Sequence, residues 1–404
     1  MPPDAVGTGR PAAPHILMVS HYFEGHRGGI EIVAGRLARE LARLGLGVTW
    51  AATGDAGAPV PEVAAVPLRA WNVSERRLGI PFPLLSPGAI RRLWAACSRA
   101  DAVIVHDSLY LTSVFALVAA RLRRIPVMVI QHIGAVEYRN PVLRTIMRAA
   151  NRLVAHPVLR SADQVVFISE TTRAHFSLPA TVRAETIFNG VDESIFHPAA
   201  SPAEGNDARD ALGIPRDAKV ALFVGRFVEK KGLHWLRRLA EAHPELLWVF
   251  AGWGPIDPES WGMANVRVFR DLAGERLADL YRASDLFVLP SKGEGFPLVV
   301  QEALASGVPV VCGEETAAAD PSATALLSGV PLRAQDEDAT VRALSEVIVR
   351  KLAEAPDRDR LQRFARERYS WRAAARRYLD LLQPMIASRS SSFRPTEAKQ
   401  RHGC

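Results

Sequence analysis

The most restrictive feature of the sequence is a double series of short apolar runs that alternate with amphipathic segments. The first series starts at "HILMVS" (15–20), and the second starts at "KVALFVGRF" (219–227). Short apolar runs bounded by turn residues are typical of buried strands, and the segments between them carry apolar residues at helical spacing. Strands that alternate with helices over short links form parallel sheets covered by helices. The sequence therefore predicts an α/β protein with two doubly wound domains in tandem.

Length and composition agree with two domains. The chain has 404 residues, 48% of them apolar and 23% charged, and a single core rarely grows to that size. A stretch rich in Asn, Gly, Pro and Asp at 189–218 separates the two series and indicates a linker. The predicted parts are a flexible tail at 1–14, an N-terminal domain at 15–198, a linker at 199–218, a C-terminal domain at 219–365, a final helix at 366–384 and a disordered tail at 385–404.

The positive charge of the chain belongs to its first half. Residues 15–190 contain 20 arginines, no lysine and 12 acidic residues, which gives +8, while the whole chain carries +7. Such asymmetry indicates an anionic partner: nucleic acid, a membrane surface or a phosphorylated substrate. Nucleic acid is the least favoured, because no basic stretch is interleaved with aromatic residues.

Several observations favour a cytoplasmic protein. No apolar stretch is long enough to span a bilayer, and the first residues lack the pattern of a secretory signal. The three cysteines are few, odd in number and without metal-ligand spacing, which suits a reducing compartment.

The stretch "SKGEGFPLVVQEALASGVPVV" (291–311) places Glu294 and Glu302 around the start of a predicted helix. Pro297 suits the first helical position, and the free backbone N–H groups that follow it form an anion site. Because carboxylates accept hydrogen bonds from paired hydroxyls, this layout suits a ligand with a sugar and a ribose joined by a diphosphate. The alternative is an ordinary acidic helix start followed by a solvated surface glutamate.

The stretch "VGRFVEKKG" (224–232) carries a second candidate group. Arg226 directly follows a strand, and Lys231 precedes the next helix. Two cations in this position would neutralise a pair of phosphates and a leaving diphosphate. The alternative is a pair of exposed loop cations, and Lys230 is expected to be their solvated neighbour.

The first half offers two weaker candidates. Gly28 and Gly29, between the first strand and its helix, allow close approach of the backbone to a ligand, although the pattern is not the GxGxxG of dinucleotide sites. His132 ends the strand "PVMVIQH", and its alternative role is that of a structural hydrogen-bonding residue. Ligands of open parallel sheets bind beyond the carboxyl ends of the strands, so Gly28, Gly29 and His132 are expected in the same cleft as the acidic pair.

A basic stripe marks the segment 139–160. Arg144, Arg148 and Arg152 repeat every four residues beside an apolar stripe. Such a helix suits an anionic membrane surface, and the alternative is an ordinary core helix with a solvated arginine face.

Taken in order, these stretches resemble the family 4 retaining glycosyltransferases (glycosyl transferases group 1) of the GT-B fold. The two glutamates match the family's E-x7-E signature, and the resemblance extends over roughly 15–383. The stretches that carry it are "RGGIE", "VIQH", "ADQVVFISE", "IFNGVDESIFHP", "VGRFVEKKG", "AGWGP", "YRASDLFVLPS" and "EGFPLVVQEALASGVPVV". It implies two Rossmann-like domains that face a central cleft, with the last helix crossing back to the first domain.

The resemblance also implies an activity and roles. The chain would transfer a hexose, with retention and without a metal or other cofactor, from a nucleoside diphosphate sugar to a glycan or lipid-linked acceptor in cell-surface polysaccharide or glycolipid biosynthesis. Glu294 would bind the donor sugar, His132 would sit at the anomeric centre, and Glu302 would bind the ribose. Arg226 and Lys231 would hold the diphosphate and stabilise it as it leaves. The remaining donor-binding residues would be Gly295, Phe296, Pro297, Leu298, Val299, Gly28 and Gly29.

Two departures from the family pattern concern donor selection. "CGEETAAADPSA" (312–323) replaces a glycine-rich loop followed by Pro-Glu, and Trp253 in "AGWGP" stands where an acidic residue is common. The base and the sugar of the donor are therefore not predicted. The D-x-D patterns at 336–338 and 357–359 lie in charged surroundings and are interpreted as solvated surface, so no metal site is expected.

Two other classes of function remain open at this point. A sugar-nucleotide epimerase or phosphorylase-like enzyme would share the two-domain plan, and an epimerase would convert the donor without any acceptor. An inactive scaffold protein of the same fold is the third hypothesis. The intact set of Glu294, Glu302, Arg226, Lys231 and His132 argues against loss of activity.

Overall fold

The computed structural model describes residues 13–26, 28–54, 62–71, 84–134 and 141–392. The chain divides into two compact units. The first comprises residues 1–130, 157–165 and 375–404, and the second comprises residues 131–156 and 166–374. Each unit is described by itself. None of the helices in the described ranges is both long and apolar enough to cross a membrane.

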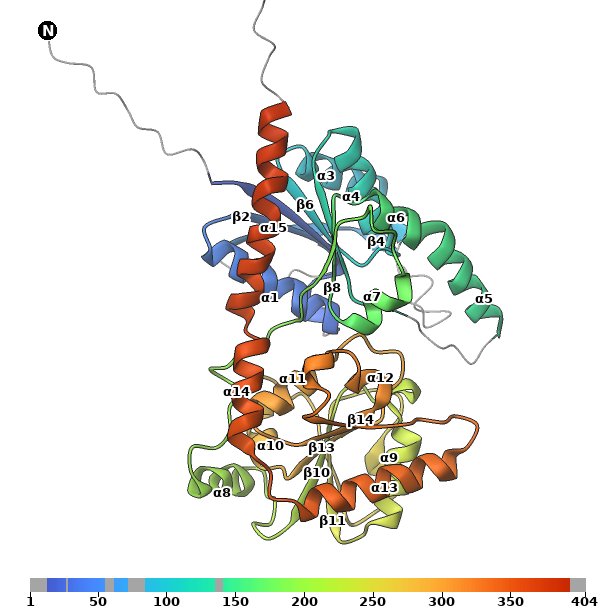
Figure 1. The fold of residues 1–404 in the computed structure, drawn as a ribbon, viewed down its shortest axis with the longest axis vertical. Coiled ribbons are helices and arrows are strands. Elements are labelled where there is room, and N and C mark those ends of the chain that lie inside the picture. Colours follow the sequence, from blue (N-terminus) through green and yellow to red (C-terminus); the bar gives the residue numbers. More distant parts are fainter. Residues whose placement is uncertain (1–12, 27, 55–61, 72–83, 135–140, 393–404) are drawn as a thin grey trace, which may run out of the picture. The chain divides into compact units, whose positions relative to one another are not determined.

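The first sheet has seven strands in the order β3-β2-β1-β6-β7-β8-β9 (Figure 1). The pairs from β3 to β7 are parallel. In β1 all residues after the first are buried, as expected for a central strand whose two faces are covered by helices. The strands are β1 (His15–Tyr22), β2 (Gly47–Thr53), β3 (Val63–Leu68), β6 (Ala102–His106), β7 (Val127–Gln131), β8 (Gln164–Phe167) and β9 (Ala184–Thr186), with β4 (Ala70–Trp71) and β5 (Leu84–Leu85) forming a separate small pair. The helices among them are α1 (Gly29–Arg43), α3 (Pro87–Cys97), α4 (Leu111–Leu122), α5 (Pro141–Ala150), α6 (His156–Ser161) and α7 (Glu170–Phe176).

The second sheet has six strands in the order β12-β11-β10-β13-β14-β15, and every neighbouring pair is parallel. The order reverses between β10 and β13, which makes the carboxyl ends of these two strands the topological switch point of the sheet. The strands are β10 (Lys219–Val224), β11 (Leu246–Ala251), β12 (Val266–Phe269), β13 (Leu286–Leu289), β14 (Val310–Gly313) and β15 (Leu327–Val330). The helices are α9 (Leu233–Ala242), α10 (Glu275–Arg282), α11 (Leu298–Ala305), α12 (Glu314–Ala317), α13 (Glu337–Ala353) and α14 (Arg358–Arg368). The predicted α/β class with two doubly wound sheets is confirmed.

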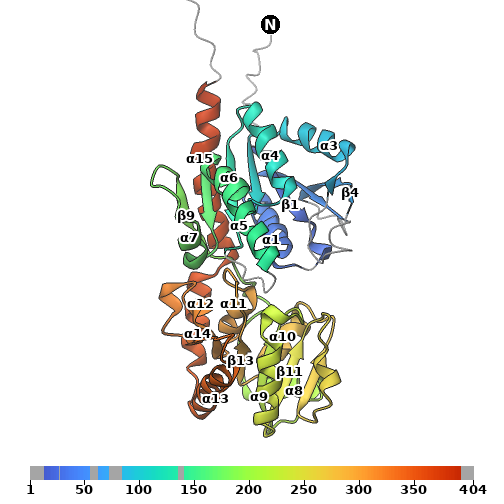
Figure 2. The same cartoon turned by 90° about the vertical axis from the view of Figure 1, so that its right-hand side faces the viewer.

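Two segments are more regular than the sequence analysis predicts. The predicted linker at 199–218 contains a helix, α8 (Pro202–Ala211), whose first turn is capped by the Ser201 hydroxyl. The last helix, α15 (Trp371–Ser392), continues beyond residue 384. The next turn contains Met385, whose side chain is buried, and this burial stabilises the added turn. This helix, red in Figures 1 and 2, begins in the second unit and belongs to the first unit from Ala375 onward. Of the predicted tails, residues 1–12 and 393–404 lie outside the described residues.

Candidate functional site

Two loops meet at the switch point of the second sheet, one after β10 and one after β13. The Lys292 N–H donates to the carbonyl oxygen of Lys230 at 3.0 Å and ties the loops together. Gly232 has φ 76°, and a Cβ atom there would lie 2.2 Å from the carbonyl oxygen of Pro290. Only glycine fits such a close approach in the left-handed region. The loops are therefore packed backbone to backbone, and their side chains share one edge of the sheet.

A buried ion pair joins these loops. The Lys231 ammonium lies 3.0 Å from Oε1 of Glu294, and the two side chains are only 12% and 14% exposed. The Lys230 ammonium lies 3.5 Å from the same oxygen, although its side chain is 51% exposed. Lys230, which the sequence analysis expects to be a solvated neighbour, is thus half exposed and also lies within ion-pair distance of Glu294.

The pKa values of the pair reflect two opposing effects. Burial raises the pKa of Glu294, but Lys231 and Lys230 outweigh burial, so the pKa of this carboxyl lies below its usual value. Burial lowers the pKa of Lys231, Glu294 opposes that shift, and the nearby Lys230 and Arg226 add to it. Glu294 is therefore a carboxylate at neutral pH, held in a cationic environment.

Arg226 extends this cationic group toward the next strand. It is exposed, and its guanidinium carbon lies 4.8 Å from the ring centre of Trp253, which follows β11. A Cβ atom on Gly225, which directly precedes Arg226, would lie 3.8 Å from Cε of Lys231, so the two predicted diphosphate-binding residues lie near each other.

Helix α11 starts beside the acidic loop. Pro297 is the N-cap and not the first helical residue, so the helix starts one position later than the sequence predicts. The first N–H groups of a helix have no partner within it, and those of Leu298 and Val299 therefore present an anion site in the second unit.

Glu302, in the second turn of α11, has a partner that the sequence analysis missed. The Tyr281 hydroxyl donates to Oε2 of Glu302 at 2.9 Å and lies 3.3 Å from the Val299 carbonyl oxygen. Tyr281 is fully buried, and burial raises the pKa of its phenol well above the usual value. A buried tyrosine hydroxyl needs a hydrogen-bond partner. Tyr281, just before a predicted buried strand, was therefore the residue in the sequence that could have indicated a polar partner nearby. Glu302 is thus held by a buried donor, unlike a freely solvated surface residue.

Two other predicted residues of the second unit are buried. The Phe296 side chain packs edge to face against Phe188 and Tyr369, so any contribution of Phe296 to donor binding must come from its backbone. His132 is also buried, and burial lowers its pKa to about 3, which keeps the imidazole neutral. A Cβ atom on Gly295 would lie 2.5 Å from the His132 carbonyl oxygen, so Gly295 brings the acidic loop against this residue.

Gly28 and Gly29 belong to the first unit, at the start of α1. Gly28 is the N-cap, and a Cβ atom there would lie 2.0 Å from the Glu31 carboxylate. That carboxylate fills the space beside Gly28, whereas no described atom other than those of its chain neighbours comes within 4 Å of a Cβ atom on Gly29. Only Gly29 therefore leaves its backbone open in the way the sequence analysis expects.

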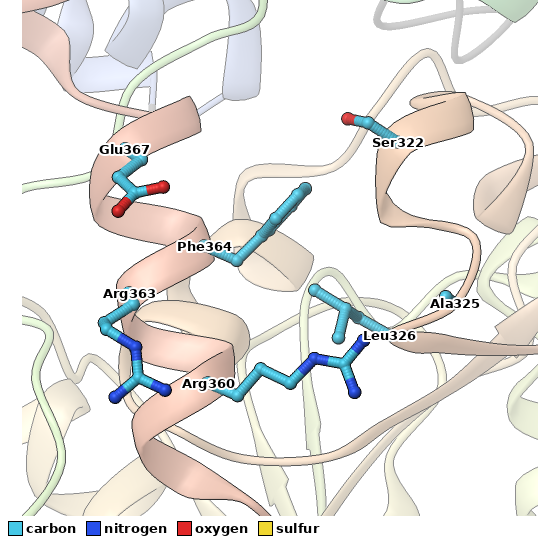
Figure 3. A pocket seen from close by; sticks show the side chains of 7 residues that line it. All are labelled: Ser322, Ala325, Leu326, Arg360, Arg363, Phe364 and Glu367. Atoms are coloured by element: carbon cyan, nitrogen blue, oxygen red, sulfur yellow. The ribbon is translucent and has the colours of Figure 1, made fainter.

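A cavity of about 250 Å³ lies elsewhere in the second unit (Figure 3). Its lining residues are Ser322, Ala325, Leu326, Arg360, Arg363, Phe364 and Glu367. None of the predicted site residues lines it, so it does not define the candidate site. In the described ranges, no group of three or more His, Cys, Asp or Glu side chains is arranged to hold a metal ion.

Solved structures share the fold. A sucrose-phosphate synthase from Thermosynechococcus elongatus has a TM-score of 0.70 and 19% identity, over 93% of this chain and all of that chain. The Anabaena protein HepE, solved in complex with UDP and glucose, has a TM-score of 0.67 and 18% identity, over 92% of this chain and all of that chain. At this identity, the likeness establishes the two-domain fold alone.

Sequence relatives are closer. The D-inositol 3-phosphate glycosyltransferase 2 of Catenulispora acidiphila is 30% identical, over 76% of this chain and 79% of the relative. The D-inositol 3-phosphate glycosyltransferase of Mycolicibacterium smegmatis is 28% identical, over 76% of each chain. The family described as Glycosyltransferase Family 4 matches residues 27–195, and the family described as Glycosyl transferases group 1 matches residues 205–368. Together with the arrangement at the switch point, these matches show that the chain belongs to the family 4 glycosyltransferases of the GT-B type.

Proposed function

We propose that this glycosyltransferase is a retaining enzyme that takes a hexose from a nucleoside diphosphate sugar. The buried Lys231–Glu294 pair at the switch point carries the proposal. Cations and a carboxylate in one partly dry site match a ligand that has phosphates beside sugar hydroxyls. A pair that served stability alone would not need to face the ligand-binding edge of the sheet.

The site divides into parts that suit the parts of such a donor. Arg226, Lys231 and the first N–H groups of α11 bind the diphosphate, and they stabilise the negative charge that grows on it as the sugar leaves. Glu294 accepts hydrogen bonds from the donor sugar. Glu302, held by Tyr281, accepts from the ribose hydroxyls. Because side chains and backbone supply the positive charge, we propose that the reaction needs no metal ion or other cofactor.

His132 contributes to the site as a neutral group. A pKa of about 3 excludes it as a proton donor near neutral pH, whereas a neutral imidazole still donates one hydrogen bond from its ring N–H. We assign it a positioning role toward the anomeric centre. Retention itself is tested by the anomeric configuration of the product, measured by NMR.

The acceptor is proposed to be an anionic glycan or a lipid-linked sugar of a cell-surface polysaccharide or glycolipid pathway. The +8 charge of residues 15–190 supports an anionic acceptor. The curated relatives are D-inositol 3-phosphate glycosyltransferases, whose named acceptor is likewise a phosphorylated polyol.

A donor panel tests the proposal. Binding and slow hydrolysis of UDP-, GDP- and ADP-sugars are measured without acceptor and with a chelator present. We expect tight binding of one donor and slow release of free sugar. Conversion into an isomeric nucleotide sugar would move the protein to the epimerase class, and absence of binding would support the scaffold alternative. If the donor binds without chelator but not with it, the proposal that no metal ion is needed is wrong.

We also propose that the protein is cytoplasmic and associates with the anionic inner face of a membrane through the segment that contains α5. Arg144, Arg148 and Arg152 are exposed, and no ion pair involves them within the described part of the chain. Ile146 and Leu153, two turns apart, are 57% and 72% exposed beside them. An ordinary core helix would bury these two residues, whereas an interfacial helix presents them to lipid between its arginines.

Liposome co-sedimentation tests the membrane contact. We expect the protein to sediment with vesicles that contain anionic lipid, and the Ile146→Ser/Leu153→Ser variant to lose this binding. The control is Leu122→Ser on α4, since Leu122 is 70% exposed and lies outside the segment that contains α5. Equal sedimentation with neutral and anionic vesicles would refute the proposal.

A further inference from the structure

Two turns of the second unit, residues 225–227 after β10 and residues 252–254 after β11, are in close backbone contact. Gly252 has φ 150°, and a Cβ atom there would lie 1.9 Å from the Gly225 carbonyl oxygen. A Cβ atom on Gly254 would lie 2.4 Å from the backbone of the other turn. No larger residue fits at either position, so the two turns have a fixed relation to each other.

Hydrogen bonds continue the strand ladder into these turns. The Gly225 N–H donates to Ala251 O at 2.9 Å, and the Phe227 N–H donates to Trp253 O at 2.7 Å. The backbone of Trp253 is therefore held from one side by the turn that carries Arg226. On the other side, the N–H of Gly252 donates to Phe269 O of β12 at 3.0 Å. The backbone that carries the Trp253 side chain therefore needs no ordering when a ligand binds.

Arg226 and Trp253 are the two exposed side chains that these turns present. The guanidinium of Arg226 lies over the indole ring at 4.8 Å, and the tryptophan remains 40% exposed. The cation covers part of one ring face. The remaining apolar surface is a rigid aromatic platform directly beside a group that binds phosphate under the proposed function.

The order of the strands fixes what lies next to what along the ligand-binding edge. Glu294 follows β13, Arg226 and Lys231 follow β10, and Trp253 follows β11, and these strands are successive neighbours in the sheet. Under the proposed function, the donor has its sugar at Glu294, its ribose at Glu302 on α11 and its diphosphate at Arg226 and Lys231. The base is the part still without a partner, and the exposed aromatic ring of Trp253 lies beside the diphosphate-binding Arg226.

We propose that Trp253 binds the nucleobase of the donor by stacking, and that this residue sets how strongly the enzyme holds the nucleotide. The inference rests on the proposed function and assigns the base to one side chain. An acidic residue at this position would offer a hydrogen-bond acceptor but no stacking surface. Stacking accepts any base, so Trp253 contributes affinity, and its larger overlap with purines favours ADP or GDP over UDP when the base contacts are otherwise equal.

Titration of the full chain with UDP, GDP, ADP and inorganic pyrophosphate tests the proposal. Trp253→Ala is expected to weaken the nucleoside diphosphate that the wild type prefers by about 5- to 150-fold, the range for loss of one stacked base. The affinity for pyrophosphate, which has no base, is expected to stay within about twofold. Trp253→Phe is expected to keep most of the affinity. In this variant, the change in tryptophan fluorescence that Trp253 shows when a nucleotide binds to the wild type is expected to be lost.

Trp94→Ala is the matched control. Trp94 is 42% exposed and also carries a guanidinium over its ring, that of Arg123 at 3.6 Å, but it lies in the first unit. Its substitution is expected to leave nucleotide binding unchanged. If Trp253→Ala weakens pyrophosphate as much as the nucleotide, the tryptophan acts only by holding Arg226, and the inference is wrong. The inference is also wrong if Trp253→Ala binds every nucleotide as tightly as the wild type, but that result does not affect the proposed function. If the wild type binds no nucleotide, both the inference and the proposed function are wrong.

Discussion

At Glu294, two forces act on one carboxyl group, and their balance determines what the site can do. Burial raises its pKa, while the lysines at 3.0 and 3.5 Å lower it further than burial raises it. The carboxylate is therefore kept charged in a place where water is scarce. It is also kept beside cations that a diphosphate would engage. Under the proposed function, a bound diphosphate would give Lys231 a second anionic partner and would leave Glu294 available to the hydroxyls of the sugar.

The energetic coupling between Lys231 and Glu294 can be measured through the free energy of unfolding in a double-mutant cycle. Lys231→Met leaves a buried carboxylate short of a partner, and Glu294→Gln leaves a buried ammonium, so each is expected to lower the free energy of unfolding by about 3 kcal/mol. The double variant removes both charges and is expected to lose about 2 kcal/mol less than the sum of the single variants. Chemical denaturation of all four proteins closes the cycle. Additive losses would mean that the pair is not energetically coupled.

The two glutamates of the E-x7-E pair are expected to differ in kinetics. The proposed function assigns Glu294 to the donor sugar, so Glu294→Gln should lower kcat about 100-fold with little change in donor KM. It assigns Glu302 to the ribose, so Glu302→Gln should raise the donor KM about tenfold with kcat nearly unchanged. Tyr281→Phe is the companion variant, since it removes the hydroxyl that donates to Glu302. It should also raise the donor KM, but by less than Glu302→Gln does. Identical kinetics of Glu294→Gln, Glu302→Gln and wild type would refute the assignment.

Some residues of the candidate site were predictable from the sequence, and some of their contacts were not. Glu294, Arg226 and Lys231 were predictable because each follows a buried strand, and parallel strands end at one edge. The 3.0 Å pair between Lys231 and Glu294 was not, because it depends on how two loops pack, and that packing depends on a glycine at 232. Phe296 shows the opposite limit, since its neighbours in the sequence suggest a ligand contact while its ring completes an aromatic core.

Among the elements, the turns after β10 and β11 show how glycine permits a site to form. Gly252→Ala combines a disfavoured φ with a Cβ atom 1.9 Å from a carbonyl oxygen, so it is expected to cost more than about 3 kcal/mol. Gly262→Ala is the matched control, because its φ is also positive, at 69°, but no described atom lies within 4 Å of the added Cβ. That variant should cost only about 1 kcal/mol. Thermal denaturation compares the two, and equal losses would show that backbone strain alone, without close packing, explains both.

The junction between α14 and α15 depends on another buried carboxylate. Asp320 has no exposed surface and accepts hydrogen bonds from Arg368 at 3.0 Å and from the Tyr369 hydroxyl at 2.9 Å. Burial raises the pKa of Asp320, but Arg368 and Ser322 lower it more, so it lies below the usual value. The folded state therefore gains stability from this group at pH values above its unfolded pKa, and it loses that gain as the pH falls through the folded value.

The sign of this shift gives a pH-dependent prediction. At pH 7 Asp320→Asn is expected to be less stable than the wild type by about 1–3 kcal/mol, because Arg368 loses its charged partner. As the pH falls from 5 toward 3, the wild type should lose stability faster than the variant, and the two curves should converge. Urea denaturation at a series of pH values measures both curves. A constant difference across this range would contradict the assignment.

At the scale of elements, alternation in the sequence predicted both sheets, because buried parallel strands must be apolar on both faces. It missed α8, although the signal was present: Ser201 precedes Pro202, and Glu204 stands in the third helical position. The Asn, Gly, Pro and Asp residues of 189–218 indicated only a linker. The predicted end of the last helix at residue 384 was wrong, because α15 continues to Ser392 with Pro384 exposed inside it.

For the whole molecule, the consequence is that the first unit is completed by the last helix of the chain. Tyr378, Leu382 and Met385 of α15 are buried, and Arg389 donates to the Ala100 carbonyl oxygen at 2.6 Å. Its guanidinium also lies 3.7 Å from Asp101. The first unit thus remains incomplete until residues 375–389 have been made, and the sequence of residues 1–130 by itself does not predict this.

This arrangement predicts that a substitution near the carboxyl terminus destabilises the amino-terminal sheet. Leu382→Ala removes a fully buried side chain and is expected to lower the free energy of unfolding of the first unit by about 2–5 kcal/mol. Leu122→Ala, on the exposed face of α4, is the control and should change it by less than about 0.5 kcal/mol. Hydrogen exchange of β1 and β6 amides reports on the first unit, and that of β10 and β13 reports on the second. We expect faster exchange in β1 and β6 alone, because the helix is part of their unit from Ala375 onward. Faster exchange confined to β10 and β13 would mean that α15 stabilises the second unit instead, and no change in either would mean that its buried residues contribute little to folding.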